Sequence, residues 1–580
     1  MITEKRHSLA HLLGDAIVKL KPSALLTIGP AVEHGFYYDV DLQGETLSLD
    51  DLPALTEIMK TTISTWSSFI KNTISEDEAK KLFAVNPYKL ELISEISTKG
   101  EEITTYTSGE FTDLCRGGHV ENMNEIEEGS WKLEKLSGAY WRGDQASTML
   151  TRVYGIAFDT KDELTQYLYQ IEEGLKRDHR KLGKELDLFT ISELVGSGLP
   201  LFKPNGVIIR RELENFLWEL HKKKGYQRVW TPHIAKEALY KTSGHSSHYM
   251  DDMFKVHGGT SKEDFYLKPM SCPHHMQIFA DTPWSYRDMP VRYFEPATIY
   301  RDEKTGQLSG LTRVRSITQD DGHLFVPVDL LKQEIGTVVE IIKKFYTTVG
   351  MIHNYRVRLS LRGENKDDYL GGDEVWDKAE GALTELCKEQ KLPYFEGPGE
   401  AAFYGPKLDF MFKDAIGREH QLATVQVDFN LPERFDLSFV NKEGQKERPV
   451  VIHRAVSGSL ERFIGVMIEH FGGSFPVWMS PNQVTVIPVL EKHEAFAKDI
   501  QDKLDDVNIR AKVMMQESLG KRIRGWKVSK EPYAIVIGDK EMESGILTIE
   551  GRNDVKFEMS LEDFTQKVLT EIKERSLDAS

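Results

Sequence analysis

Cysteine is scarce in this chain. Cys115, Cys272 and Cys387 are its only three among 580 residues, too few and too scattered for a disulfide framework. No apolar run is long enough to cross a bilayer, and the first residues show no signal-peptide apolar region followed by a small-residue cleavage site. These absences argue against a disulfide-rich secreted domain and a helical membrane protein, and they predict a reducing, cytoplasmic location.

Glycine-rich phosphate-binding strings are also absent. The chain has no GxxxxGK[ST] string and no GxGxxG fingerprint. The net charge of −17 argues against broad nonspecific binding to nucleic acid. Two basic runs, 176–184 and 520–530, leave room for a local basic path, although a solvated face is the simpler interpretation of each run taken alone.

The length and the pattern of elements predict a multidomain α+β protein. Hydrophobic content of 40% and charged content of 28% fit a soluble globular chain of several domains. Residues 1–157 mix helix and strand signals, and 158–184 form a charged connecting helix. Residues 185–476 interleave helices and strands without a βαβ rhythm, which favours an antiparallel core. Residues 477–580 predict a small α/β domain with a mixed or parallel sheet.

Charged residues cluster in three strings of the middle segment. A strand-like run, FEPATIYRDE, is expected to carry Arg301 and Glu303 on one face, because residues two apart point the same way. A glycine-containing loop then leads into a second strand-like run; these two segments carry Arg313, Arg315, Gln319, Asp321 and His323. GEAAFYGPKLDF holds Tyr404 and Lys407, and Arg462 follows Gly458 on a strand-to-helix passage.

Several arginines with one glutamate suit a nucleotide. A guanidinium can bind phosphate through two bonds, and a carboxylate can accept from an exocyclic amine. Because a glycine cradle is missing, side chains would have to hold the phosphates. For any single arginine a surface ion pair is a reasonable alternative, but much less so for the whole set.

These strings resemble a known family. YRDE, RVRSITQDDGHLF and HRAVSGSLERF are similar to motifs 2 and 3 of class II aminoacyl-tRNA synthetases. KPMSCPHH, AFYGPKLDF and QLATVQVDFNLP resemble the threonyl-tRNA synthetases, and the likeness runs from His7 to the C-terminus. It implies an N-terminal editing domain, a linker helix, a class II catalytic core and a C-terminal anticodon-binding domain. The small extra N-terminal domain of many bacterial members is expected to be missing.

The resemblance gives the cysteine of PMSCPHHMQ a role. It implies a catalytic Zn²⁺ held by Cys272, His323 and His453, with one position left open for substrate. A thiolate and two imidazoles are suitable zinc ligands. Taken alone, Cys272 could be a nucleophile, a metal ligand or a small buried thiol, and the buried thiol is the simplest interpretation. A core residue is likewise the simplest interpretation of each histidine by itself.

The resemblance also implies a reaction. Threonine and ATP form threonyl-adenylate with the help of Mg²⁺, and tRNA(Thr) then accepts the threonyl group. Arg301 would contact the α-phosphate and the threonine carboxylate, and Glu303 the adenine amino group. The further implied residues are Arg313 and Arg462 at the γ-phosphate, Gln319 with ATP, Lys407 in the active site, and Asp321, Tyr404, Gln426 and Ser459 at threonine. His245 would help to deprotonate the tRNA sugar hydroxyl, although an exposed loop histidine is a strong alternative.

An open zinc position predicts uneven selectivity. Valine lacks the hydroxyl that fills the position, and rejection of this kind reaches about 10⁴–10⁵-fold. Serine lacks only a methyl group, which is worth roughly 10–200-fold. The synthetic site is therefore expected to admit serine, so a hydrolytic check on seryl-tRNA(Thr) is expected as well.

The first domain has candidates for that check. His7 and His11 are four residues apart and share one face of a predicted helix, and TDLCRGGHV adds Cys115 and His119. The spacing alone favours a four-ligand metal set. The resemblance instead implies water activation and ester positioning without a required metal, with Lys89 and Asp113 nearby.

The remaining expectations concern tRNA binding and assembly. The basic run GKRIRGWKVSK, in the anticodon-binding domain implied by the resemblance, is expected to meet the RNA backbone. Trp526 is expected in the core rather than stacked on a base. Glu543 and Arg552 resemble anticodon-reading positions. The family's homodimer interface would lie around 205–219 and 231–232.

Three residues depart from the family pattern: Ile317 replaces an aromatic residue, His274 a glycine beside Cys272, and Gly118 a proline. Ile317 puts the ATP pose in doubt, and His274 could crowd the metal or compete as a ligand.

Two alternative functions stay open. Another class IIa enzyme would not need the zinc set, and a non-catalytic tRNA-binding paralogue would tolerate loss of Arg301, Glu303 or Arg462.

Overall fold

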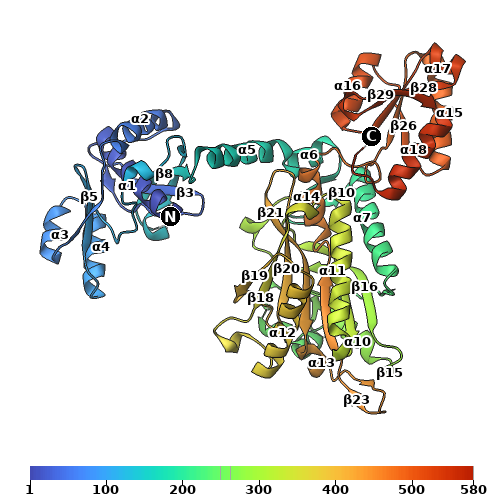
Figure 1. Ribbon diagram of the computed structural model, residues 1–580, viewed down its shortest axis with the longest axis horizontal. Coiled ribbons are helices and arrows are strands. Elements are labelled where there is room, and N and C mark those ends of the chain that lie inside the picture. The colour runs from blue at the N-terminus through green and yellow to red at the C-terminus, as the bar shows by residue number, and fades with distance from the viewer. Residues whose placement is uncertain (145, 249, 261–262, 579–580) are drawn as a thin grey trace. The chain divides into compact units, whose positions relative to one another are not determined.

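The computed structural model describes residues 1–144, 146–248, 250–260 and 263–578 (Figure 1). The chain divides into two compact units, Met1–Glu172 (unit 1) and Glu173–Ser580 (unit 2). Among the described residues, no helix has both the length and the apolar content needed to cross a membrane.

Unit 1 opens with the predicted helix, α1 (Ile2–Leu20). Its apolar stripe, including Leu9, Leu13 and Ile17, is buried against the sheet β1-β3-β8-β7. β2 and β3 form an antiparallel hairpin. The remaining bounds in unit 1 are β1 (Leu25–Leu26), β2 (Ala31–Val32), β3 (Gly35–Asp41), α2 (Leu52–Ile63), β4 (Ile70–Thr73), α3 (Glu76–Leu82), α4 (Pro87–Thr98), β5 (Thr104–Ser108), β6 (Phe111–Leu114), β7 (Trp131–Tyr140) and β8 (Met149–Ala157).

The charged connecting segment is two helices, not the single helix expected from the sequence. α5 (Lys161–Arg177) ends just before Asp178, and α6 (His179–Glu185) begins directly after Asp178. Asp178 has non-helical dihedral angles (φ −46°, ψ 119°), and its side chain accepts a hydrogen bond from the backbone N–H of Arg180. Asp178 therefore acts as the N-cap of a new helix, a role that aspartate favours.

Unit 2 is built on an eight-stranded sheet in the order β11-β16-β17-β24-β21-β20-β18-β19. Neighbours pair antiparallel except at β11–β16 and β18–β19, which confirms the predicted antiparallel core. The bounds are β11 (Gln227–Arg228), β16 (Val291–Tyr300), β17 (Ser316–Val326), β18 (Arg356–Leu361), β19 (Tyr394–Pro398), β20 (Lys407–Lys413), β21 (Glu419–Asp428) and β24 (Val450–Ala455).

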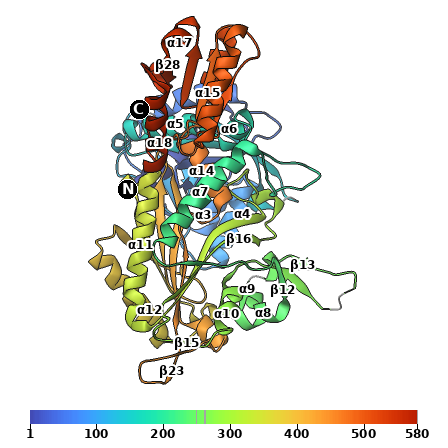
Figure 2. The same ribbon diagram turned by 90° about the vertical axis from the view of Figure 1, so that its right-hand side faces the viewer.

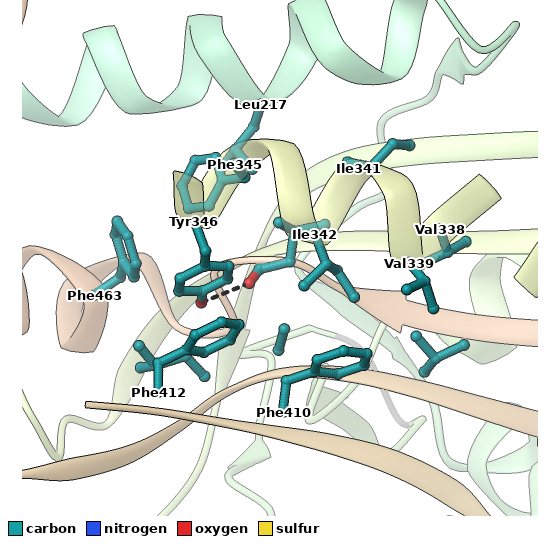
Figure 3. Close-up of a cluster of buried hydrophobic side chains, with 14 of the residues drawn as sticks. Leu217, Val338, Val339, Ile341, Ile342, Phe345, Tyr346, Phe410, Phe412 and Phe463 are labelled. Atoms are coloured by element: carbon teal, nitrogen blue, oxygen red, sulfur yellow. Dashed lines mark hydrogen bonds between the residues drawn. The ribbon is translucent and has the colours of Figure 1, made fainter. Parts of the chain in front are cut away.

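Helix α11 (Leu331–Thr348) packs its apolar face on this sheet. Figure 3 shows Val338, Val339 and Ile342 of α11 above Phe410 and Phe412 of β20. The one hydroxyl in this group, that of Tyr346, donates to the carbonyl of Val456 at 2.9 Å, so no polar atom of this ring is left unpaired. The packed helix holds the sheet rigid, and other residues of the same sheet form the candidate site.

Further elements of unit 2 surround the sheet. Figure 2 shows α8, α9 and α10 grouped beside β12 and β13. The bounds are β9 (Phe189–Thr190), β10 (Leu201–Phe202), α7 (Pro204–Lys222), β12 (Ile234–Lys236), α8 (Glu237–Ser243), α9 (His245–His248), β13 (Lys255–Val256), β14 (Phe265–Leu267), α10 (Cys272–Ala280), β15 (Trp284–Ser285), α12 (Asp373–Glu389), α13 (Asn430–Arg434), β22 (Phe439–Val440), β23 (Lys446–Glu447) and α14 (Leu460–His470).

The C-terminal part of unit 2 has the predicted mixed sheet, in the order β26-β25-β27-β28-β29. β25 pairs parallel with both neighbours, and the other pairs are antiparallel. Trp526 is buried in a small apolar cluster, which confirms the core prediction. The bounds are β25 (Val484–Pro488), α15 (Glu494–Asp506), β26 (Ala511–Val513), α16 (Leu519–Ser529), β27 (Tyr533–Ile537), α17 (Asp539–Ser544), β28 (Ile546–Gly551), β29 (Lys556–Ser560) and α18 (Leu561–Glu574).

Candidate functional site

Three side chains from distant parts of the sequence meet in unit 2. One ligand atom of each of Cys272, His323 and His453 lies within 4.8 Å of the other two, and all three residues are buried. His323 on β17 and His453 on β24 are direct partners across the two antiparallel strands, and so face the same side of the sheet. Cys272 is the first residue of α10. The fold therefore assembles the donor set that the resemblance implies.

The ring nitrogens of the two histidines face each other. His323 Nε2 lies 2.9 Å from His453 Nδ1. The remaining nitrogens have other partners: His453 Nε2 is 2.8 Å from Asp428 Oδ2, and His323 Nδ1 is 2.7 Å from His275 Nδ1. His275 Nε2 is in turn 3.0 Å from Glu295 Oε2.

With three neutral imidazoles, these contacts determine which ring nitrogens carry the protons. A carboxylate only accepts, so Asp428 holds a proton on His453 Nε2, and Glu295 holds one on His275 Nε2. His275 Nδ1 then accepts from His323 Nδ1. The atoms left with bare lone pairs are His323 Nε2 and His453 Nδ1, which face each other. A cation between them would relieve that repulsion, so the donor set fits a metal ion.

Burial sets the charge of this group. Burial and the neighbouring histidines lower the pKa of His323 well below its usual range, which leaves a neutral imidazole ready to bind a metal. Burial, with Asp321 and Asp428 nearby, raises the pKa of the Cys272 thiol. A bound cation would reverse that shift and give the thiolate.

Glu295 ends the series of hydrogen bonds that runs from His323 through His275, and its carboxylate is held in place by other residues. Its carboxylate accepts from the backbone N–H of Thr231 at 2.7 Å and pairs with Lys268 at 3.4 Å. Burial alone would raise the pKa of Glu295, but His275 and Lys268 lower it below its ordinary value. Sequence reasoning missed His275, Glu295 and Asp428. The adjacent histidines of PHHM were the available signal for His275.

His274 does not join the metal group. It is not among the described residues whose ligand atoms cluster with Cys272. Its ring is buried, with its centroid 6.3 Å from that of Tyr240, and both ring nitrogens lack a hydrogen-bond partner. The expectation that His274 might compete as a ligand is not supported.

His245 lies beside Cys272 rather than on an exposed loop. It begins α9 and is fully buried. Its Nδ1 is 2.7 Å from Ser243 Oγ, and its Nε2 is 3.6 Å from Cys272 Sγ. The exposed-loop alternative is therefore wrong.

The expected threonine-binding residues Asp321, Tyr404 and Gln426 lie next to the metal group. Lys407, Gln426 and His453 are successive partners across β20, β21 and β24. The Tyr404 hydroxyl donates to Gln426, and the Tyr404 ring centroid lies 5.0 Å from that of His453. Asp321 is two residues before His323 on β17, and burial raises the pKa of its carboxyl group. Ser459 pairs with Gln319 and caps α14 by accepting from the N–H of Arg462.

A polar cavity of about 380 Å³ includes Arg301, Glu303 and Arg313 in its lining. Arg313 pairs with Glu303 at 2.8 Å. The prediction that Arg301 and Glu303 share a strand face is wrong: β16 ends at Tyr300, and the N–H of Glu303 turns back to the carbonyl of Arg301. The turn, rather than strand alternation, brings both side chains to one cavity. Ile317 stands opposite Ile299 on β16.

A second cluster lies in unit 1. Ligand atoms of His7, His11, Cys115 and His119 fall within 4.8 Å of one another. The Cys115 sulfur is 3.5 Å from His7 Nε2 and 3.3 Å from His119 Nε2. Burial lowers the pKa of His119 to about 2 and raises the pKa of Cys115 to about 11, so these groups are neutral near pH 7.

The unit 1 cluster opens into a cavity of about 380 Å³. Lys89 also lines it and forms a buried ion pair with Asp113 at 2.5 Å. Tyr38 donates to the same carboxylate. Gly118 has a φ of +86°, which proline cannot adopt, so the departure at this position matches the backbone seen here.

The two expected anticodon residues differ in exposure. Glu543 is exposed on α17. Arg552 is turned inward: its guanidinium donates to the carbonyls of Phe475 and Lys530, and burial lowers its pKa to about 10. In this structure, Arg552 joins β28 to the segment before β25.

Comparisons with known proteins show which domains the chain contains. Residues 254–471 match the class II tRNA synthetase core domain (G, H, P, S and T), residues 483–571 the anticodon-binding domain, and residues 103–154 the second additional domain of threonyl and alanyl tRNA synthetases. The chain is 45% identical to a threonine–tRNA ligase of Rubrobacter xylanophilus, covering 98% of this chain and 89% of that protein.

Other relatives give the same result. A Thermus thermophilus threonine–tRNA ligase is 45% identical over 99% of this chain and 89% of its own length. Among solved structures, the RNA-binding domain of a Cryptosporidium parvum threonyl-tRNA synthetase has a TM-score of 0.65 and 33% identity, covering 68% of this chain and 98% of that one. With a buried Cys-His-His set in a class II core, the chain belongs to the threonine–tRNA ligase family.

Proposed function

We propose that this chain attaches L-threonine to tRNA(Thr) through threonyl-adenylate, using ATP with Mg²⁺, and hydrolyses seryl-tRNA(Thr) at a second site. The observation that carries the proposal is the 2.9 Å approach of His323 Nε2 to His453 Nδ1, in a buried group that also includes Cys272. Zn²⁺ held there would supply an open coordination position that distinguishes threonine from valine.

The side chains around that position have distinct tasks in this proposal. Asp321, Tyr404 and Gln426 orient the threonine amino and hydroxyl groups, with Ser459 and Lys407 beside them. Arg301 holds the carboxylate against the α-phosphate, so that the attacking oxygen and the leaving pyrophosphate are in line. Glu303 reads the adenine amino group, Gln319 lines the nucleotide site, and Arg313 and Arg462 neutralise the γ-phosphate. The Glu303–Arg313 ion pair would have to open when ATP enters.

His245 is proposed to assist transfer to tRNA through its neighbours. Full burial supports an indirect role, because its Nε2 approaches Cys272 and Met270. Glu543 and the exposed cations of α16 are proposed to meet tRNA. Arg552 is proposed to act there by holding β28 in place.

The unit 1 cavity is proposed as the editing site. Neutral His7, His11 and His119 can pass a proton to or from water, and the Lys89–Asp113 pair supplies fixed charge beside them. Unit 1 would then remove the serine that the synthetic site admits. The proposed domain limits are 1–157 for editing, 158–184 for the linker, 185–476 for catalysis and 477–580 for anticodon binding.

The proposal includes a cytoplasmic location and a homodimer, and exposed apolar residues support the homodimer. Trp230 is 74% exposed and Leu194 fully exposed, and Val207 on α7 is also exposed. Exposed apolar side chains mark an interface where they form a contiguous patch. Val207 falls within the 205–219 segment expected to form the dimer, and Trp230 directly precedes the 231–232 segment.

ATP–pyrophosphate exchange tests the synthetic half of the proposal. Exchange should depend on threonine, with serine a weak substrate and valine inactive. Exchange that needs another amino acid, or none at all, would contradict the proposal.

A further inference from the structure

His179 occupies a buried position at the start of α6 that the proposed chemistry does not use. It is 4% exposed. The loop between β16 and β17 comes unusually close to it: a Cβ at Gly310 would stand 2.1 Å from His179 Nε2, and Gly310 has a φ of +48°. Only glycine fits this approach without displacement.

Both ring nitrogens of His179 are engaged. The backbone N–H of Leu311 donates to Nε2 at 3.0 Å. An N–H can only donate, so Nε2 is the acceptor and the proton resides on Nδ1. Nδ1 then donates to Glu469 Oε1 at 2.6 Å, and the backbone N–H of His179 donates to the same oxygen at 3.0 Å.

A metal site does not explain this group. Asp178, His179 and Glu469 do bring three possible ligand atoms together. Each is already committed: Asp178 pairs with Arg180, His179 uses both nitrogens, and the second oxygen of Glu469 pairs with Arg418 at 2.6 Å. The group is instead a hydrogen-bonded joint, in which His179 links the loop at Leu311 to Glu469 of α14.

The joint connects two parts of the proposed nucleotide site. Leu311 lies two residues before Arg313, in the loop that lines the polar cavity. Glu469 is seven residues after Arg462, two turns along the same helix and therefore near the same face. One neutral imidazole thus ties the loop that carries Arg313 to the helix that carries Arg462.

We infer that His179 is a positioning residue for ATP: its Nε2 holds the loop that carries Arg313 at a fixed place relative to α14. This inference rests on the proposed role of Arg313 in nucleotide binding. The inference predicts that losing the bond between His179 and Leu311 weakens ATP binding alone. Neither Leu311 nor Glu469 belongs to the metal group of Cys272, His323 and His453.

Two substitutions separate the two bonds. His179→Asn places an amide near the position of Nδ1, so it can keep the Glu469 bond but loses the acceptor for Leu311. His179→Gln places an amide oxygen near the position of Nε2, so it can keep the Leu311 bond and loses the one to Glu469. In ATP–pyrophosphate exchange, His179→Asn should raise the KM for ATP about three- to tenfold, the range expected for one buried hydrogen bond. The KM for threonine and the zinc content should not change.

His179→Gln should keep the KM for ATP within about twofold of the unaltered chain while lowering Tm. If His179→Asn does not fold, Gly310→Ala tests the same contact from the loop and should raise the KM for ATP similarly. Arg313→Ala is the control for the proposed function. An unchanged ATP KM in Arg313→Ala would reject the role of the loop. A raised KM in Arg313→Ala with an unchanged KM in folded His179→Asn would overturn the inference about His179.

Discussion

At the scale of single residues, proton placement decides what the central site can bind. Asp428 and Glu295 lie at the two ends of a chain of bonds through three histidines. Because each carboxylate can only accept, the chain leaves its two free lone pairs between His323 and His453. In the proposed function, Asp428, Glu295 and His275 prepare the site for a cation without being its ligands.

His275 should therefore control zinc affinity without being a ligand. His275→Phe keeps the ring volume but removes the acceptor for His323 Nδ1, and we expect zinc to bind about 10–100-fold more weakly. Competition with a chromogenic chelator measures this. His221→Phe is the matched control, because His221 is equally buried and bonds only the Leu217 carbonyl. Equal zinc affinity in both variants would refute the role of His275.

At the scale of elements, strand register brings the site together. His323 and His453 are 130 residues apart in sequence, yet β17 and β24 place them directly opposite each other. Sequence patterns predicted the strands and the helices, but not which strands pair. The metal set was reached only through the family resemblance, since no local spacing reveals ligands this far apart.

Some features could not be predicted from the local pattern. His275 and Asp428 look like core residues in sequence, because their function is visible only through hydrogen bonds made across the sheet. Arg301 and Glu303 appeared to continue a strand, but the chain turns after Tyr300. Asp178 divides the expected linker helix because its side chain caps the next helix.

The turn between β20 and β21 allows a pH test of stability. Asp414 is buried there with Arg418 and His420. Burial alone would raise the pKa of Asp414, but these partners lower it to about 2. A depressed pKa gives stability that is present above the unfolded pKa of about 4 and is lost as pH falls toward 2.

Asp414→Asn should therefore destabilise unit 2 by about 2 kcal/mol at pH 7. The difference in Tm from the unaltered chain should narrow between pH 4 and pH 3, as measured by scanning calorimetry. Asp436→Asn is the control, because Asp436 is exposed. A Tm difference that stays constant with pH would show that the charge on Asp414 is not what stabilises the turn.

At the scale of the whole molecule, synthesis and correction are assigned to different compact units. The serine that the synthetic site admits differs from threonine by one methyl group, which a binding pocket discriminates poorly. Placing a separate hydrolytic cavity in unit 1 allows each site to be altered without the other.

His7→Ala should leave threonylation of tRNA unchanged and let seryl-tRNA(Thr) accumulate. The reason is that His7 lines the unit 1 cavity and takes no part in the group around Cys272. Acid-gel separation of tRNA charged with labelled serine measures the product. His34→Ala is the control, because His34 is exposed in the same unit. Equal seryl-tRNA in both variants would remove the editing assignment.

A charged side chain introduced at the exposed Trp230 tests whether the chain forms the proposed dimer. Trp230→Asp should convert the dimer to a monomer, as measured by light scattering, because it would bury an unpaired carboxylate at the interface. Val440→Asp introduces the same charge at another exposed apolar position and should leave the dimer intact. A Trp230→Asp chain that stays dimeric would place the interface elsewhere.

The central claim is that Cys272, His323 and His453 bind the zinc ion that selects threonine. Zinc per chain, measured together with threonine-dependent ATP–pyrophosphate exchange in Cys272→Ala, tests it most directly. Cys387→Ala is the control, since Cys387 is a buried thiol outside any metal group among the described residues. The account predicts that Cys272→Ala loses both zinc and exchange while Cys387→Ala keeps both. Threonine-dependent exchange that persists in zinc-free Cys272→Ala would contradict it.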